Sequence, residues 1–301
     1  MVNAGMQATT RALLRKPPWS LSWLLARVVV FGPAILVLLR RLNEATVEME
    51  VLPDRDVLHT LHIDAFQLLA WGVAFFLLWQ LGPTRRPNRV DIAAAITICL
   101  IGGLSSAAGL VALTIFLTVT ALLGDRSAQR LATATVFGAL FVQQAIIPIL
   151  YDMLVPILTR FDTMLVGFFA ELTIRGATWQ GDTISVPWDH SIIVAGGCCS
   201  FRNVSLATLC WVALTKLERP EWQPLDIGVL VIAAGFQIGL NVVRIYLMAL
   251  SDNMYLYWHT GMGAHIFAVT ASAGAVLICA FGARYVSCSR AAPRNGLAVE
   301  G

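Results

Sequence analysis

Two adjacent cysteines are the residues most suited to chemistry in this sequence. They lie in the stretch 196–203, which reads Gly-Gly-Cys-Cys-Ser-Phe-Arg-Asn and precedes an apolar segment. A cysteine that opens a helix lies beside unpaired backbone N–H groups and the positive end of the helix dipole, and both favour the thiolate. Cys198 and Cys199 are therefore candidate nucleophiles, and we expect the helix start to lower the thiol pKa.

An arginine and a histidine are candidate partners of these cysteines. Arg244 lies inside a later apolar segment, and His259 lies just before the next one. Arg244 could lower the pKa of a nearby thiol or hold an oxyanion or a carboxylate. His259 could protonate a leaving amine and then deprotonate the incoming nucleophile. The three residue types together fit acyl transfer through a thioester.

Each of these residues also has a purely structural interpretation. Free cysteines in membrane helices mostly serve as small apolar packing residues. An arginine near the end of a span can reach the head groups, and a single histidine at an interface is more often structural than catalytic. We favour packing for Cys198 and His265, and function for Cys199, Arg244 and His259.

The composition predicts a membrane protein. Hydrophobic residues make up 57% of the 301 residues and charged residues only 13%, and the mean hydropathy is +0.73. The apolar blocks are about 17 to 25 residues long, the length with which a helix crosses a bilayer. We expect an all-α polytopic bundle formed by residues 1–290, in contact with membrane lipid, and a short basic cytoplasmic tail at 291–301. The sequence has no long basic run interleaved with aromatics, which argues against nucleic acid as a partner.

Eight membrane spans are expected from the apolar blocks. They are 20–39, 65–82, 91–104, 107–123, 131–150, 204–217 with a start nearer 198, 225–249 and 263–283. The long apolar run 91–123 is divided at Gly-Gly-Leu-Ser-Ser (102–106), because small turn-forming residues permit a tight hairpin. Residues 151–170 follow Pro148 and contain Pro156, and we expect a further helix that packs on the bundle or lies in the interface.

The lysines and arginines predict the orientation of this bundle. Of the 21, 13 lie on the amino-terminal side of the membrane, six lie on the opposite side, and Arg27 and Arg244 lie within spans. The positive-inside rule then makes both termini cytoplasmic. Arg244 is about 19 residues into its helix, roughly 28 Å from the inner end. It should therefore reach the outer face, where Cys199 and His259 are also expected.

Three motifs follow one another in the last third of the chain. They are Cys-Ser-x-Arg from Cys199 to Arg202, Asn-Val-Val-Arg from Asn241 to Arg244, and His-x-x-x-Gly-x-x-x-Phe from His259 to Phe267. In this order they resemble the exosortase and archaeosortase family of membrane cysteine transpeptidases. The approach to the cysteines, Gly-Asp-Thr-Ile-Ser-Val-Pro (181–187), is also similar to that family. The resemblance covers about residues 145–286.

The resemblance implies a role for each matching residue. Cys199 matches the nucleophile because Ser200 follows it, and Arg244 and His259 match the essential arginine and histidine. Asn241 precedes Arg244 by three residues, so it shares a helix face with the guanidinium and could orient it.

Three residues near these motifs depart from the family pattern. Phe201 replaces the usual glycine after Cys-Ser and would crowd the backbone beside the nucleophile. Ala264 replaces a frequent tryptophan, and Cys198 is an extra cysteine that supports or competes with Cys199.

The activity implied by the resemblance is cleavage of a carboxy-terminal sorting signal on exported proteins. Such a signal consists of a short motif, a membrane helix and a basic cluster, and in Gram-negative members of the family the motif is commonly Pro-Glu-Pro. The mature protein would pass through a thioester of Cys199 to an acceptor amine, whose identity the sequence does not give, or to water. No cofactor or metal is implied, and the site is expected on the outer face of the cytoplasmic membrane.

Three other classes of function remain open at this point. A transporter could use Arg244 as a substrate contact, although no internal repeat is visible. A thiol oxidoreductase could use Cys198 and Cys199 as a redox pair, although adjacent cysteines bridge only through a strained ring. A metal or haem protein could use histidines, which all fall on the predicted outer side: His59, His62, His190, His259 and His265.

Overall fold

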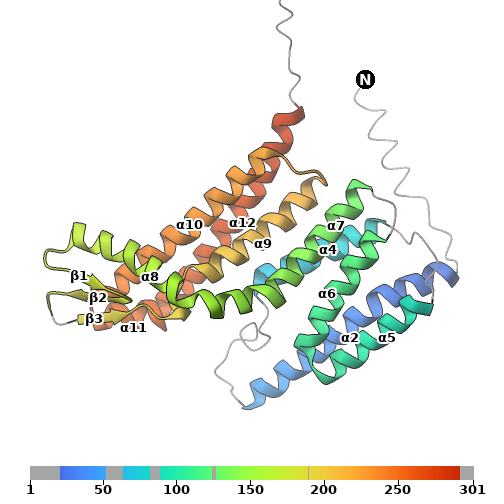
Figure 1. Cartoon of the computed structure of the whole chain (residues 1–301), viewed down its shortest axis with the longest axis horizontal. Coiled ribbons are helices and arrows are strands. Elements are labelled where there is room, and N and C mark those ends of the chain that lie inside the picture. Colours follow the sequence, from blue (N-terminus) through green and yellow to red (C-terminus); the bar gives the residue numbers. More distant parts are fainter. Residues whose placement is uncertain (1–20, 52–63, 82–88, 124–126, 189, 292–301) are drawn as a thin grey trace, which may run out of the picture.

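The computed structural model describes residues 21–51, 64–81, 89–123, 127–188 and 190–291 (Figure 1). Its helices are α2 (Leu21–Val51), α4 (Ala65–Leu81), α5 (Arg89–Leu104), α6 (Ser106–Leu122), α7 (Ala128–Phe141), α8 (Ile147–Thr173), α9 (Phe201–Glu218), α10 (Pro224–Ala249), α11 (Asp252–His259) and α12 (Met262–Ala291). A helix lies at each expected span, which confirms the all-α fold class.

Membrane-spanning length is clearest for three helical segments. Ala128–Thr173, Pro224–Ala249 and Met262–Ser289 are long and apolar enough to cross a bilayer, and Ala65–Leu81 and Ser106–Leu122 are shorter apolar helices. The total of eight spans and the orientation of the termini stay predictions.

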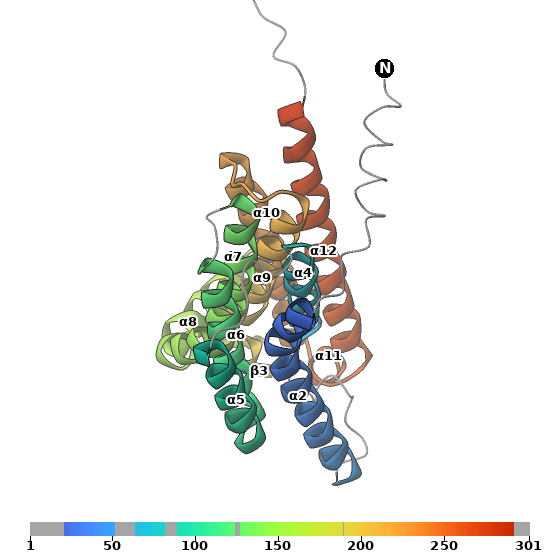
Figure 2. The ribbon, with the colours of Figure 1, turned by 90° about the vertical axis from the view of Figure 1, so that its right-hand side faces the viewer.

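The helices form two groups joined by a central pair. Helices α2, α5 and α6 pack on one another, as do α9, α10 and α12, and α4 and α7 lie between the groups (Figures 1 and 2). The main core fills this central region, where Trp71 and Phe75 of α4 contact the ring of Phe137 on α7 at centroid distances of 6.0 Å.

The expected hairpin after residue 101 is confirmed. Helix α5 ends at Leu104, and Ser105 caps α6 by accepting a hydrogen bond from the Ala108 N–H. A Cβ on Gly109 would lie 2.5 Å from the Cα of Gly102, so only glycine lets the two helices approach this closely.

Helices α7 and α8 form one long helical segment that bends. A π-helical turn, η1 (Val142–Ile146), joins them, and the chain changes direction there (Figure 1). The 46 residues from 128 to 173 would span about 69 Å if straight, more than twice the hydrocarbon thickness. Residues 151–170 belong to α8, which contacts α10, and Asp162 and Val166 are buried whereas Ile157 and Phe168 are exposed.

A small antiparallel sheet was not predicted. Its strands are β1 (Thr178–Gln180), β2 (Thr183–Val186) and β3 (His190–Ile193), in the order β1-β2-β3. Gly181 has a φ of 65°, as the first central residue of a two-residue hairpin loop requires. Helix α8 contacts β1 and β2, and helix α10 contacts β2 and β3.

The sheet is anchored to the end of α10. The Trp188 Nε1–H donates to the carbonyl of Leu250 at 2.8 Å, and His190 lies 3.2 Å from the carbonyl of Met248 and 2.9 Å from Asp252. A second hydrophobic core, which includes Val166 of α8, Ile184 of β2 and Ile245 of α10, joins these elements. The end of the bundle that carries the cysteines is therefore a packed unit of α8, α10 and the sheet.

Candidate active site

The two cysteines lie in a tight turn between β3 and α9. A 3₁₀ turn, η2 (Gly196–Cys198), leads into them, and Cys199 donates its backbone N–H to the carbonyl of Gly196 at 2.9 Å. Cys198 is 6% exposed and Cys199 is 4% exposed. The Phe201 N–H, the first of α9, lies 3.5 Å from the sulfur of Cys199. The expectation that a helix start faces the Cys199 sulfur is confirmed.

A carboxylate that the sequence analysis missed supports this turn. Asp162 of α8 is 1% exposed, and it accepts hydrogen bonds from the Ser200 N–H at 2.7 Å and the Ser200 hydroxyl at 2.8 Å. An ionisable residue in an apolar helix is a signal of function. It could have been noticed if residues 151–170 had been placed beside the cysteines.

The surroundings of Cys199 favour the thiol, not the thiolate. Burial raises its pKa to about 11, the Phe201 N–H acts in the opposite direction, and the nearby Asp162 carboxylate raises the pKa further. The expectation of a lowered pKa is therefore wrong, because burial outweighs the helix start.

The charge of Arg244 affects the pKa of Cys198 more than the pKa of Cys199. Burial raises the pKa of the Cys198 thiol and the charge of Arg244 lowers it, whereas Arg244 is not among the main influences on Cys199. The guanidinium Nε–H donates to the carbonyl of Trp258 at 3.1 Å, and its central carbon lies 4.7 Å from the ring centroid of Phe267.

Asn241 joins the cysteine turn to α10. Its side-chain N–H donates to the carbonyl of Cys198 at 2.8 Å, and the residue is 1% exposed. The structure thus shows Asn241 holding the backbone of the turn, whereas we expected it to orient the guanidinium of Arg244.

His259 ends α11 with its ring stacked on Tyr255, at a centroid distance of 4.9 Å. Its Nδ1 is buried and has no hydrogen-bond partner among the described residues. An unpaired buried ring nitrogen is available to a proton or to a substrate group.

The third motif explains how α11 and α12 meet. A Cβ on Gly263 would lie 2.7 Å from the Tyr257 ring and 2.8 Å from the Trp258 ring, so glycine is needed for this close approach. Phe267, four residues later, covers the guanidinium of Arg244. Ala264 is half-buried, and its backbone N–H donates a hydrogen bond to the carbonyl of Gly261.

A cavity of about 270 Å³ lies beside the cysteine turn. Gly196, Gly197 and Phe201 line it together with Tyr151, whose ring stacks on Phe201 at a centroid distance of 6.2 Å. Phe201, which replaces the usual glycine, therefore forms one wall of this cavity.

The alternative metal site finds no support in the described part of the chain. No group of three or more histidines, cysteines or acidic residues there could hold a metal ion. His59 and His62 lie outside the described residues, and His190 is engaged with the end of α10.

Most of the chain matches a known protein family. Residues 61–275 match the family described as Transmembrane exosortase (Exosortase_EpsH). The chain belongs to the transmembrane exosortase family. It is therefore a membrane protein of a family of cysteine-dependent peptidases and transpeptidases that act on exported proteins with carboxy-terminal signals. No curated protein and no solved structure matches this exosortase-family chain.

Proposed function

We propose that the protein cleaves the carboxy-terminal sorting signal of exported proteins and transfers the product to an acceptor. The supporting observation is a pair of hydrogen bonds from the Asn-Val-Val-Arg motif to the residues just before the other two motifs. Asn241 binds the carbonyl of Cys198, and Arg244 binds the carbonyl of Trp258, the residue before His259. The nucleophile, the cation and the proton carrier thus belong to one connected unit.

The reaction begins with proton transfer, because a thiol with a pKa of about 11 is almost entirely protonated near pH 7. His259 takes the proton of Cys199 as the sulfur attacks the carbonyl carbon of the scissile peptide bond. The positive charge of Arg244 stabilises the oxyanion. The C–N bond then breaks, the leaving amine takes the proton from His259, and a thioester remains on Cys199.

The second half reaction releases the product. An acceptor amine gives a proton to His259 and attacks the thioester carbon, the C–S bond breaks, and the sulfur of Cys199 takes the proton back. Water in place of the amine gives simple proteolysis.

The test compares the two cysteines. We expect Cys199→Ala to abolish processing of a co-expressed exported protein that ends in a motif, a membrane helix and a basic cluster, and Cys198→Ala to spare most of it. Equal processing by Cys199→Ala and the unaltered protein would overturn the role of Cys199 as the nucleophile, and full processing by both variants would overturn the proposal. Loss in Cys198→Ala alone would transfer the nucleophile to Cys198, the thiol on which Arg244 acts.

The location follows from the predicted orientation. Residues 1–290 form one bundle of eight spans in the cytoplasmic membrane, with both termini inside and the site on the outer face. Helix α11, which ends at His259, and the start of α9, which follows Cys199, lie at the same end of the bundle as the sheet (Figure 1), and this supports a single face for the chemistry.

A further inference from the structure

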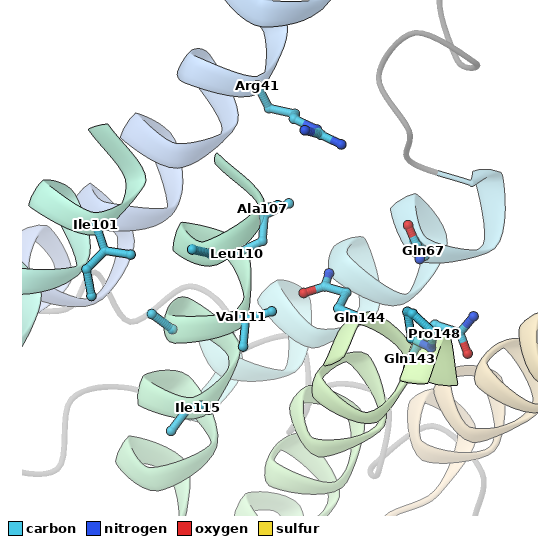
Figure 3. Close-up of a pocket in the computed structure, with 12 residues that line it drawn as sticks. Arg41, Gln67, Ile101, Ala107, Leu110, Val111, Ile115, Gln143, Gln144 and Pro148 are labelled. Carbon is cyan, nitrogen blue, oxygen red and sulfur yellow. The ribbon is translucent and has the colours of Figure 1, made fainter. Parts of the chain in front are cut away.

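A second cavity, of about 650 Å³, adjoins the one beside the cysteine turn. Gln67, Gln143 and Pro148 line both cavities, so the two lie side by side. In the close-up, α6 forms one wall with Ala107 and Val111, and Arg41 of α2 lies at one end (Figure 3). We call the two adjoining cavities together the glutamine groove. It extends from helices α2 and α6 to the turn that carries Cys199.

Glutamine side chains make one wall of this groove polar. The π-helical turn η1 brings the consecutive residues Gln143 and Gln144 to the groove, and π turns often occur at functional sites. Gln143 donates to the hydroxyl of Ser205 at 3.3 Å. The Gln144 Oε1 is buried and has no partner among the described residues, so it is an acceptor without a donor.

The charged side chains that line the groove within the described residues are arginines. Arg41 lines one cavity and Arg202 lines the other, and no described aspartate or glutamate lines either cavity. Arg41 donates to the hydroxyl of Ser106 at 2.9 Å. Arg202 is exposed and forms no ion pair within the described ranges. Arg202 would therefore hold an acidic side chain at the end of the groove beside the cysteine turn.

An extended peptide fits this lining. A polypeptide that leaves a membrane helix loses its internal backbone hydrogen bonds, and unpaired backbone groups are costly away from water. A glutamine amide offers both a donor and an acceptor, which is the pairing that a peptide unit needs. The opposite wall of small and apolar residues accommodates the side chains.

We propose that the glutamine groove binds the substrate beside its scissile bond as an extended chain, with Gln144 on its backbone and Arg202 on an acidic side chain. This inference rests on the proposed function, because the groove ends at Gly196, Gly197 and Phe201, which flank the cysteines. Apart from Arg202, it assigns substrate recognition to α4, η1 and α6, which carry none of the three family motifs.

The first experiment measures binding without chemistry. In a Cys199→Ala background, Ala108 of the groove is replaced by photoreactive benzoylphenylalanine, and Val119, an exposed residue of α6 outside both cavities, is replaced in the matched control. We expect the co-expressed substrate to cross-link at position 108 and not at position 119. Equal cross-linking at the two positions, or none at 108, would overturn the groove proposal.

The second experiment measures recognition during turnover. We expect Gln144→Leu to raise KM about tenfold with kcat nearly unchanged, because it removes a contact made before the reaction. Gln129→Leu, an exposed glutamine of α7 that donates to Gln80, is the control and should leave KM unchanged. Arg202→Gln should abolish the preference for a substrate with an acidic residue in its motif over the corresponding amide.

The outcomes separate the two proposals. If Gln144→Leu has the KM of Gln129→Leu while Cys199→Ala is inactive, the groove proposal is wrong and the proposed function stands. If Cys199→Ala and Cys198→Ala both process the substrate like the unaltered protein, the proposed function itself is wrong.

Discussion

The thiol of Cys199 is kept protonated by its surroundings. It is 4% exposed, and the carboxylate of Asp162 on α8 accepts a hydrogen bond from the hydroxyl of the next residue, Ser200. Both features oppose the helix start that the sequence suggested. A buried neutral thiol reacts slowly with small electrophiles, so the resting site is protected until a substrate and a base are in position.

The raised pKa predicts the pH dependence of Cys199 alkylation. Only the thiolate reacts, and its fraction rises about tenfold per pH unit below the pKa. We therefore expect the alkylation rate by iodoacetamide to rise steadily from pH 7 to 10 without a plateau, because the pKa is about 11. Free cysteine should level off above about pH 8.5. Mass spectrometry of the Cys199 peptide measures the rate, and a plateau near pH 8 would contradict the prediction.

Asp162→Asn separates the charge of Asp162 from its shape. The loss of a negative charge should lower the pKa of the Cys199 thiol, so the alkylation profile should move to lower pH. Processing should fall, because an amide nitrogen cannot accept one of the two Ser200 hydrogen bonds, at a cost of about 1–3 kcal/mol. Asp152→Asn, on the exposed side of α8, is the control. A profile that rises equally at every pH would indicate loosening of the turn and would contradict the charge effect.

At the level of elements, the corner between α11 and α12 positions two parts of the site. It carries His259 on one side and, through Phe267, covers Arg244 on the other. Gly263 gives this corner its tight geometry, because any larger residue would meet the rings of Tyr257 and Trp258.

Two glycine substitutions should therefore have opposite effects. We expect Gly263→Ala to destabilise the protein by about 1–3 kcal/mol and to reduce processing, since its Cβ would enter an occupied space. Gly239→Ala in α10 meets no atom within 4 Å and should stabilise the helix by about 0.5–1 kcal/mol. Thermal unfolding in detergent measures both. Equal melting temperatures for the two variants would argue against the corner as described.

The elements differ in how well the sequence predicted them. The helices of the apolar blocks and the hairpin at Ser105 follow from local composition and turn residues, so they were predicted closely. The sheet was missed because its strands are three or four residues long and depend on contacts with α8 and α10. Asp162 was missed for the same reason, since its role depends on a contact with Ser200, 38 residues later.

For the whole molecule, the orientation in the membrane is the main prediction still to be tested. Cys288 is exposed near the end of α12, on the predicted cytoplasmic side, and Ile193 of β3 is 67% exposed on the predicted outer side. In spheroplasts, a membrane-impermeant maleimide should label Ile193→Cys in the intact state and Cys288 only after permeabilisation. The variants carry alanine at the remaining cysteines. The reverse labelling pattern would invert the proposed topology.

The partners of Arg244 impose an order on biosynthesis. Its hydrogen-bond acceptor, Trp258, and its aromatic cover, Phe267, are both translated after it. When α10 first leaves the ribosome, the guanidinium of Arg244 has neither of these two contacts. We therefore expect the Arg244 side chain to take its final position only after α11 and α12 have been made. The complete site then forms only at the end of synthesis.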